Sequence, residues 1–367
     1  MASFLASSKM ALAAYVRSWW KQPHEQPDTS CPLLDQMPVE LIDCIADFLA
    51  PADKVLLALT CRAMRACLGQ HSDAARLSRA EYFTYLAGMA RALPEQWVCD
   101  YCMTLHPINK YDKPTTLRRP CSCPRYDTRA LWRRSRVQNG RHIGIEHHHV
   151  QLALKYTRLK QQKYDSYLQS LLEPYQNEPF DTLGRGNITH EVRYSAYPRI
   201  VTGRDGNPRL LLLSIWKYLA GGRDIMVRNI GRQRICPHLQ FFDWDYPSYS
   251  NNLLQTFQWA LGPGNRGTEW RSVCARCATD FSVMLRDGNL YLQVWQDFGP
   301  EGSPLDLTWR SQNVRPGLDG AVNSALTGPT LHHQPGSIEE LYGPTPQRLP
   351  VPDNRSPWVY FVPQFIP

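Results

Sequence analysis

The sequence has no hydrophobic run long enough to cross a membrane. Its longest apolar stretches, such as Met10–Val16 and Leu210–Leu213, are far shorter than the roughly 20 residues that a bilayer span requires. Residues 1–20 also lack the continuous apolar core and the cleavage site of a secretory signal. We therefore expect no membrane partner and a reducing compartment, for which the cytoplasm and the nucleus are equally open.

The sequence also lacks the short motifs that mark common catalytic sites. It contains no Gly-x-x-x-x-Gly-Lys-Ser/Thr phosphate loop, no His-Glu-x-x-His metalloprotease motif and no Gly-x-Ser-x-Gly nucleophile elbow. The glycine-rich stretch Gly184–Asn187 matches no phosphate loop. We expect a protein that is not an enzyme.

The composition that remains is that of a globular protein. The 367 residues are 43% hydrophobic and 20% charged, which predicts an ordinary core and about two domains. The net charge of +8 arises between Lys110 and Arg141, where ten basic residues accompany two acidic ones. Such a stretch can attract an acidic partner, although most basic surfaces are simply solvated.

Three short helices are expected between residues 34 and 71. The first carries apolar residues at the spacing of one helix face, namely Leu41, Ile45, Phe48 and Leu49. Pro38 suits the start of this helix, and Pro51 is expected to end it. Asp53 is expected to cap the second helix and Thr60 the third. Helices this small cannot bury all their leucines among themselves, so another surface must cover the rest.

This segment resembles a known module. The residues that carry the resemblance are Met37-Pro38-x-Glu40-Leu41-x-x-x-Ile45-x-x-x-Leu49, then Asp53 to Leu59, then Thr60-Cys61-Arg62-x-x-Arg65. Their order is similar to the F-box, a three-helix family that docks on a Skp-type adaptor and thereby joins a cullin ubiquitin ligase. Met37 departs from the usual leucine. The resemblance implies an adaptor-binding set of Pro38, Leu41, Ile45, Leu49, Leu56, Leu57 and Cys61.

Beyond the F-box-like segment, periodicity predicts helices and then strands. Helices are expected over 73–93 and 148–172. Strands are expected over 188–201, 209–219, 224–230 and 235–244. Asp287-Gly288 between two apolar runs is a strong hairpin signal, so we expect a largely antiparallel sheet.

These patterns predict an α+β chain with five parts. They are a flexible N-terminus (1–33), the F-box-like helices (34–71), a linker helix (72–96), a cysteine-rich α+β domain (97–312) and a mostly irregular tail (313–367). The 68 residues from Pro300 onward hold 12 of the 29 prolines, which favours irregular structure. We expect Trp358–Phe365 to dock back as an extended segment.

Seven of the eleven cysteines lie in close groups. The groups are Cys99-x-x-Cys102, Cys121-x-Cys123, Cys236-Pro237-His238 and Cys274-x-x-Cys277. A Cys-x-x-Cys turn lets two thiolates converge on one ion, and residues i and i+2 of an extended strand point to the same side. Four such pairs supply eight ligands, which predicts two tetrahedral zinc sites. The competing interpretation is a set of free buried thiols.

The spacing leaves the pairing of these ligands open. We favour the sequential arrangement of Cys99, Cys102, Cys121 and Cys123 in one site and Cys236, His238, Cys274 and Cys277 in the other, because shorter loops cost less entropy to close. An interleaved arrangement would join Cys99 and Cys102 to Cys274 and Cys277, or to Cys236 and His238. His106 could replace one cysteine of the first site, and the run His147–His149 is a weaker candidate.

Four protein ligands at each site leave no open position, so the predicted zinc is structural. A compact RING-type ligase is not expected, because the ligands are spread from Cys99 to Cys277. The Trp97–Pro107, Ile235–Leu239 and Cys274–Phe281 stretches are similar to a group of filamentous-fungal F-box proteins of unassigned substrate, over about residues 36–310.

The two resemblances imply a substrate receptor of a cullin ubiquitin ligase, with an unknown protein target. The runner-up is a zinc-stabilised nucleic-acid-binding protein, supported by the basic stretch with Tyr126 and Trp132 in it. Nucleic acid is the less favoured partner because the rest of the chain is charge-neutral. A third possibility is an F-box scaffold that acts outside the ligase.

Overall fold

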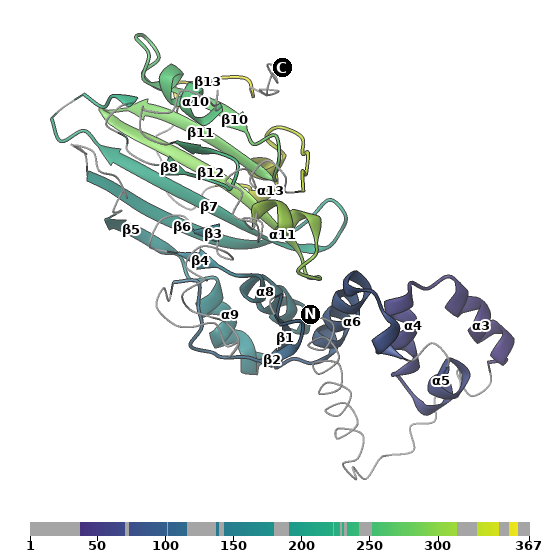
Figure 1. Cartoon of the computed structure of the whole chain (residues 1–367). Coiled ribbons are helices and arrows are strands. Elements are labelled where there is room, and N and C mark those ends of the chain that lie inside the picture. The colour runs from purple at the N-terminus through teal and green to yellow at the C-terminus, as the bar shows by residue number, and fades with distance from the viewer. Residues whose placement is uncertain are drawn as a thin grey trace. The chain divides into compact units, whose positions relative to one another are not determined.

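The computed structural model describes residues 37–69, 73–115 except Tyr101, 137–138, 143–179, 191–222, 224–227, 230, 233–241, 252–313, 329–344 and 352–358 (Figure 1). The chain divides into two compact units, one of Met1–Ile108 with Gly302–Leu305, the other of Asn109–Glu301 with Asp306–Pro367. As predicted, it is a mixed α+β chain with a mainly antiparallel sheet. Among the helices of these described ranges, none is long and apolar enough to cross a membrane.

The first unit begins with three short helices, α3 (Val39–Asp47), α4 (Pro51–Ala58) and α5 (Arg62–Cys67). The predicted helices are present, but two of the expected caps are wrong. Pro51 is the first residue of α4 rather than the end of α3, so the N-cap is Ala50 and not Asp53. Cys61, and not Thr60, caps α5 by accepting a hydrogen bond from the N–H of Met64 at 3.4 Å.

The next helix of this unit is shorter than the expected 73–93. A 3-10 turn η2 (Ala74–Arg76) comes first, and α6 (Arg79–Ala92) begins only after Ser78. Ser78 and Glu81 form a reciprocal capping box, which satisfies two amide groups and sets this start.

Two apolar clusters hold the first unit together. The first joins the three short helices through Ile42, Ala46, Ala58, Met64 and Leu68. The second packs the other side of α4 against α6 and the hairpin β1 (Gln96–Val98) and β2 (Leu105–Pro107). Leu305 also packs against this second cluster. The predicted domain start at residue 97 therefore falls inside this unit, whose boundary lies at Ile108.

The second unit is built on one seven-stranded sheet of order β13-β10-β11-β12-β7-β6-β5 (Figure 1). Its strands are β5 (Tyr175–Pro179), β6 (Glu191–Thr202), β7 (Pro208–Leu219), β10 (Thr268–Val273), β11 (Thr279–Arg286), β12 (Asn289–Pro300) and β13 (Asn354–Arg355). The predicted β11–β12 hairpin is confirmed, since Asp287 and Gly288 both have positive φ (50° and 74°), as a primed two-residue turn requires.

The interior strand β7, between β12 and β6, is buried on both faces. Leu210 and Leu212 belong to the core on one face, whereas Leu211 and Leu213 belong to the core on the other. Alternate residues of a strand point to opposite faces, so a run of four leucines predicts a strand covered on both sides.

Different helices cover the two faces. Residues of α8 (His147–Leu159) and α10 (Asn252–Ala260) contribute to the larger core, and those of α13 (Ser337–Tyr342) to the smaller one. The single helix expected over 148–172 is wrong. It breaks at Lys160, which has a φ of 50°, and continues as η3 (Gln162–Tyr164) and α9 (Asp165–Leu171).

Some shorter predictions are also corrected. The described residues of 224–230 form no strand, and two two-residue strands, β8 (Gln233–Arg234) and β9 (Gln240–Phe241), replace the expected 235–244 strand. A further two-residue pair joins β3 (Val137–Gln138) to β4 (Gly144–Ile145). The helix α11 (Leu307–Gln312) follows β12.

The C-terminal region has more structure than expected. The buried Asp280 accepts hydrogen bonds from the N–H groups of Ile338 (2.8 Å) and Glu339 (3.0 Å), and so anchors the start of α13. β13 adds a parallel strand beside β10, and the guanidinium of Arg271 lies 4.9 Å from the Trp358 ring. The end of the predicted 358–365 segment and the N-terminal 1–33 lie outside the described residues.

Candidate metal centres and an exposed helix face

Four predicted metal ligands meet in the second unit. The donor atoms of Cys236, His238, Cys274 and Cys277 all lie within 4.8 Å of one another, and the three cysteines are buried. The structure therefore supports the sequential pairing for this set. The chain brings them together from two turns, one between β8 and β9 and one between β10 and β11.

Both turns have backbone geometry that presents sulfur to an ion. In the first, the N–H of Ile235 donates to the carbonyl of Leu239 (3.1 Å), and the N–H of Leu239 donates to Cys236 Sγ (3.3 Å). The pair Cys236 and His238 thus converges in a turn, and the expected extended strand is wrong. Amide groups that point at sulfur stabilise a thiolate.

The second turn is closed in a similar way. The N–H of Cys274 donates to the carbonyl of Thr279 (2.9 Å), and the N–H of Arg276 donates to Cys274 Sγ (3.4 Å). The hydroxyl of Thr279 lies 3.2 Å from Cys277 Sγ. Each thiol of this pair therefore has a polar neighbour of its own.

The spacing of the group fits a tetrahedral ion. His238 Nδ1 lies 3.7 Å from Cys274 Sγ. Metal–ligand bonds of zinc length at tetrahedral angles place sulfur and nitrogen about 3.6 Å apart. We conclude that the group could hold a metal ion.

The three thiols share their ionisation unequally. Burial raises the pKa of Cys236 and Cys277 well above the usual range, and contact with the sulfur of Cys274 contributes to the rise at both. Burial acts in the same direction at Cys274, but hydrogen bonds with Cys236, Cys277 and His238 outweigh it and hold the pKa of Cys274 well below the usual range. Because metal ligands must be deprotonated, binding of an ion here would release protons.

A second group lies in the first unit, beside the β1–β2 hairpin. It consists of Cys99, Cys102 and His106, whose donor atoms also lie within 4.8 Å of one another. Cys102 Sγ is 2.9 Å from His106 Nε2 and 2.8 Å from the hydroxyl of Thr104. Met103, directly after Cys102, has a φ of 55°, which lets the chain turn tightly between Cys102 and β2.

The electrostatics of this second group favour a thiolate. A hydrogen bond with Cys99 is the largest influence on Cys102, and those with His106 and Thr104 act in the same direction. Together they outweigh burial and lower the pKa of Cys102 to about 3. This group could also hold a metal ion.

The first predicted site is therefore only partly described. His106, which the sequence offers as an alternative ligand, lies with the Cys99 and Cys102 pair. Cys121 and Cys123 lie outside the described residues. His148 and His149 lie in the second unit beside Asp112, and so do not belong to the Cys99 group as it is described.

The predicted adaptor-binding residues divide into two sets. Leu41 and Ile45 on α3 are 53% and 47% exposed, whereas Ile42 and Ala46 on the opposite side are 3% and 2% exposed. Pro38 is exposed as well. The helix α3 thus has one apolar face in the core of the first unit and a second apolar face outside it.

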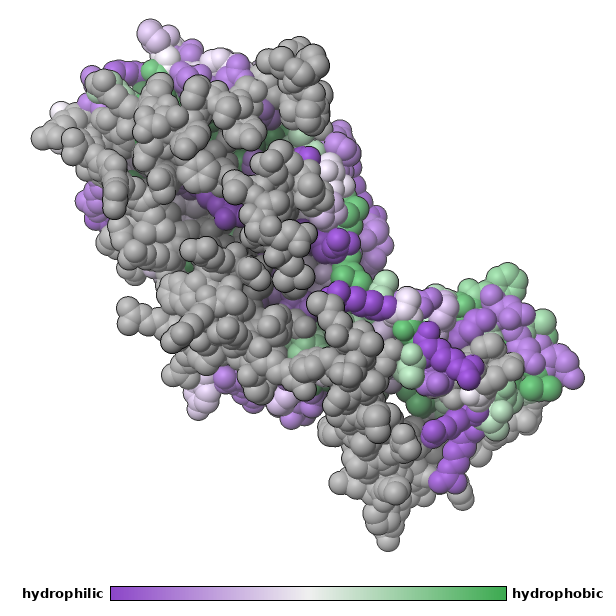
Figure 2. Space-filling view, viewed as in Figure 1, coloured by the Kyte–Doolittle hydropathy of each residue, from purple (hydrophilic) through white to green (hydrophobic). Residues whose placement is uncertain are grey.

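One exposed residue extends this outer face beyond the predicted adaptor-binding set. Phe48 is 92% exposed. Its spacing from Leu41 and Ile45 places it on the same apolar helix face in the sequence, although not among the adaptor contacts. Figure 2 shows apolar side chains at the surface of the part that carries α3, α4 and α5. We call Leu41, Ile45 and Phe48 the α3 outer face.

The other predicted adaptor contacts are half-buried and engaged inside the unit. Leu49, Leu56, Leu57 and Cys61 are of intermediate exposure. Leu56 packs against the α6 cluster and Leu57 against the cluster of the three short helices. Cys61 caps α5.

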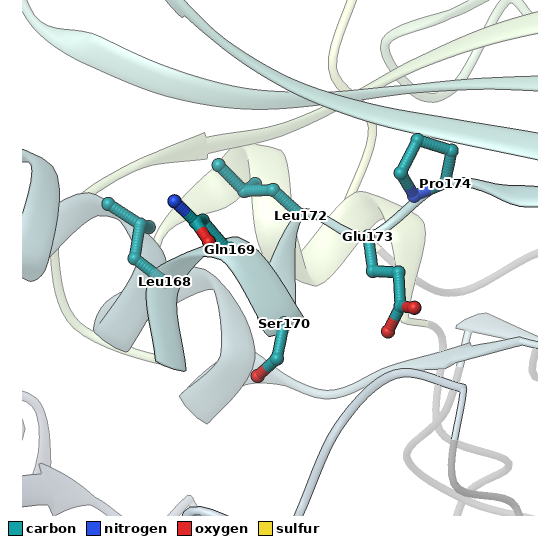
Figure 3. A pocket seen from close by; sticks show the side chains of 6 residues that line it. All are labelled: Leu168, Gln169, Ser170, Leu172, Glu173 and Pro174. Carbon is teal, nitrogen blue, oxygen red and sulfur yellow. The ribbon is translucent and has the colours of Figure 1, made fainter. Parts of the chain in front are cut away.

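A surface hollow in the second unit offers fewer groups that could bind a ligand. It has a volume of about 560 Å³ and is lined by the residues labelled in Figure 3, Leu168 to Ser170 and Leu172 to Pro174. Two of its polar groups already have partners, since Ser170 donates to the carbonyl of Tyr167 (2.8 Å) and Glu173 lies 3.6 Å from Lys113.

No family model, curated protein or solved structure matches this chain.

Proposed function

We propose that this protein is a substrate receptor that docks through the α3 outer face on a Skp-type adaptor of a cullin ubiquitin ligase. The observation that carries the proposal is the contrast on α3, where one apolar face is buried and the other is open to solvent. Contiguous apolar patches on a soluble protein usually mark interaction sites. An amphipathic helix with exposed anchors is a common binding element at helical interfaces.

The F-box-like order of residues 37–65 supports the same partner, because it places Pro38, Leu41 and Ile45 where the resemblance expects adaptor contacts. The half-buried Leu56, Leu57 and Cys61 would contribute at the rim or by supporting α3 from inside. Phe48, the most exposed of the large apolar residues that the structure describes, would be a central anchor.

The second unit would present the protein target. A receptor contributes proximity between a target and the charged conjugating enzyme rather than bond chemistry. We propose zinc as the ion of the Cys236 group, and of the Cys99 group, because thiolate and imidazole donors at tetrahedral spacing select zinc. Such ions would brace the turns that carry them.

The test is co-purification of the full chain with the Skp-type adaptor of its own host. We expect stoichiometric binding by the natural chain and its loss in the Leu41→Asp/Ile45→Asp double variant. Each anchor of this kind contributes about 2 kcal/mol or more, so the Kd should rise by at least ~100-fold.

A matched control is Met226→Asp, which places the same charge on an exposed apolar residue of the second unit. This variant should bind the adaptor normally. Failure of the folded natural chain to bind, or equal binding by the double variant and the control, would overturn the proposal.

A further inference from the structure

Three metal-ligating side chains outside both cysteine groups meet in the interior of the second unit. Asp112, His148 and His149 are 2%, 3% and 1% exposed, and their donor atoms lie within 4.8 Å of one another. His148 Nε2 is 3.1 Å from Asp112 Oδ2, and His149 Nε2 is 3.3 Å from Asp112 Oδ1. One carboxylate therefore faces two imidazoles.

The surrounding structure positions each of these groups. His148 and His149 lie in the first turn of α8, with ring centroids 4.1 Å apart. The hydroxyl of Tyr167 on α9 donates to the carbonyl of Asp112 (3.0 Å), which holds the Asp112 segment against the helices. A carboxylate oxygen of Glu146 lies 3.5 Å from Nδ1 of His148.

The geometry of this group presents three donors to one point. Both Nε2 atoms face the same carboxylate, one at each of its oxygens. Glu146 is the N-cap residue of α8, and its backbone N–H donates to Nδ1 of His149 (3.1 Å). Two imidazole nitrogens and a carboxylate that converge in the interior are a donor set typical of transition-metal ions.

We propose that Asp112, His148 and His149 bind a divalent transition-metal ion at a third site, separate from the two cysteine groups. Two imidazoles and one carboxylate suit ions such as Zn²⁺ or Co²⁺. Glu146 beside Nδ1 of His148 has the place of the outer carboxylate that commonly orients a metal-bound histidine.

The proton balance of binding can be written out. His148 releases its Nε2 proton to solvent and keeps the Nδ1 proton that faces Glu146. His149 moves its proton from Nε2 to Nδ1, so the hydrogen bond from the Glu146 amide is lost and the ring and amide must separate. Three hydrogen bonds are given up, namely the two from Nε2 to Asp112 and the one from the Glu146 amide, while three metal–ligand bonds form.

The consequence of binding would be a cross-link within the second unit. Asp112 lies near the start of the basic stretch Lys110–Arg141, and His148 follows shortly after its end. An ion held by both would close the base of this stretch and reduce the freedom of its ends.

The test is titration of the metal-free, reduced full chain with Co²⁺ under visible absorption. We expect the natural chain to bind one equivalent more than Asp112→Asn. The additional ion should give weak ligand-field bands without the intense thiolate-to-cobalt absorption of the cysteine groups. Asp165→Asn, an exposed aspartate on α9, is the matched control and should bind as the natural chain does.

Equal numbers of Co²⁺ ions bound by the natural chain and by Asp112→Asn would overturn the proposal, because Asp112 would then be a ligand of no metal ion. If Asp112→Asn fails to fold, the test is made by NMR on the natural chain alone. Zn²⁺ should shift the Nε2 resonances of two histidines that have no thiolate neighbour in long-range proton–nitrogen NMR spectra. Unchanged resonances at these histidines would count against the site.

Discussion

Nδ1 of His238 lies 3.7 Å from Sγ of Cys274, although the two residues are 36 positions apart in the chain. The contact joins the β8–β9 turn to the β10–β11 turn. A metal ion between them would tie a short peripheral hairpin to the main sheet, which contributes most where the closed loop is long. Several predictions about stability depend on this and on similar contacts, and each can be measured on the purified chain.

Replacing a ligand of the Cys236 group should remove one metal ion. We expect Cys277→Ser to lower the zinc content by one ion per chain and to weaken binding by more than the 10–100-fold of an outer-residue change. A loss of about 3 kcal/mol should lower Tm by about 6–12 °C. Elemental analysis and calorimetry measure both. Cys44→Ser, at an exposed cysteine, is the control, and equal results for the two variants would contradict a metal site.

The two faces of α3 should respond differently to the same charge. Ile42→Asp places a carboxylate in the core of the three short helices and should cost about 3–5 kcal/mol or unfold the first unit. Leu41→Asp on the outer face should change stability by no more than ~0.5 kcal/mol. Urea unfolding followed by circular dichroism gives both values. Similar losses in both variants would mean that Leu41 is buried in the protein in solution.

The buried Lys155 on α8 should lower stability at neutral pH. The pKa of Lys155 is lowered from about 10.5 to about 8, mainly by burial. The nearby charge of Glu301 raises this pKa, but burial and the charge of Arg158 together outweigh it. Between these values the folded chain binds fewer protons than the unfolded chain, so stability should rise with pH across this window. The corresponding cost below pH 8 is about 3 kcal/mol at most.

We therefore expect Lys155→Met to raise the free energy of unfolding by about 1–3 kcal/mol at pH 7. The gain should shrink as the pH rises from 8 through 10.5, because the folded side chain is then already neutral and the unfolded one becomes neutral as well. Lys110→Met, at an exposed lysine, should show no such pH-dependent gain. Denaturant curves at the two pH values compare the variants, and a loss of stability in Lys155→Met would refute the expectation.

Gly336 should tolerate substitution less well than a glycine of the same conformation elsewhere. Gly336 and Gly264 both have a φ of 83°, but a Cβ at Gly336 would overlap the Trp358 ring, whereas nothing lies within 4 Å at Gly264. Left-handed backbone costs about 1–2 kcal/mol for alanine at either position. Gly336→Ala should lose at least ~1 kcal/mol more in thermal unfolding, and equal losses would show that Trp358 does not pack there.

Several features could be predicted because they depend on neighbouring residues. The β11–β12 hairpin follows from Asp287-Gly288 between apolar runs, and the four leucines of β7 reflect burial on both faces. The break of the 148–172 helix was not predicted, because apolar spacing continues across Lys160 and only the packing of α9 requires the turn. The same holds for α13, whose start depends on the distant Asp280.

The sequence by itself determined the α+β class, the three short helices and the cysteine pairs, because each is set by residues close together in the chain. Only the tertiary structure decided which pairs share a site, that His106 accompanies Cys99 and Cys102, and which side of α3 is open. It also placed Asp112 against two histidines 36 and 37 positions away. Such choices depend on how separate elements pack, and neither spacing nor periodicity records that packing.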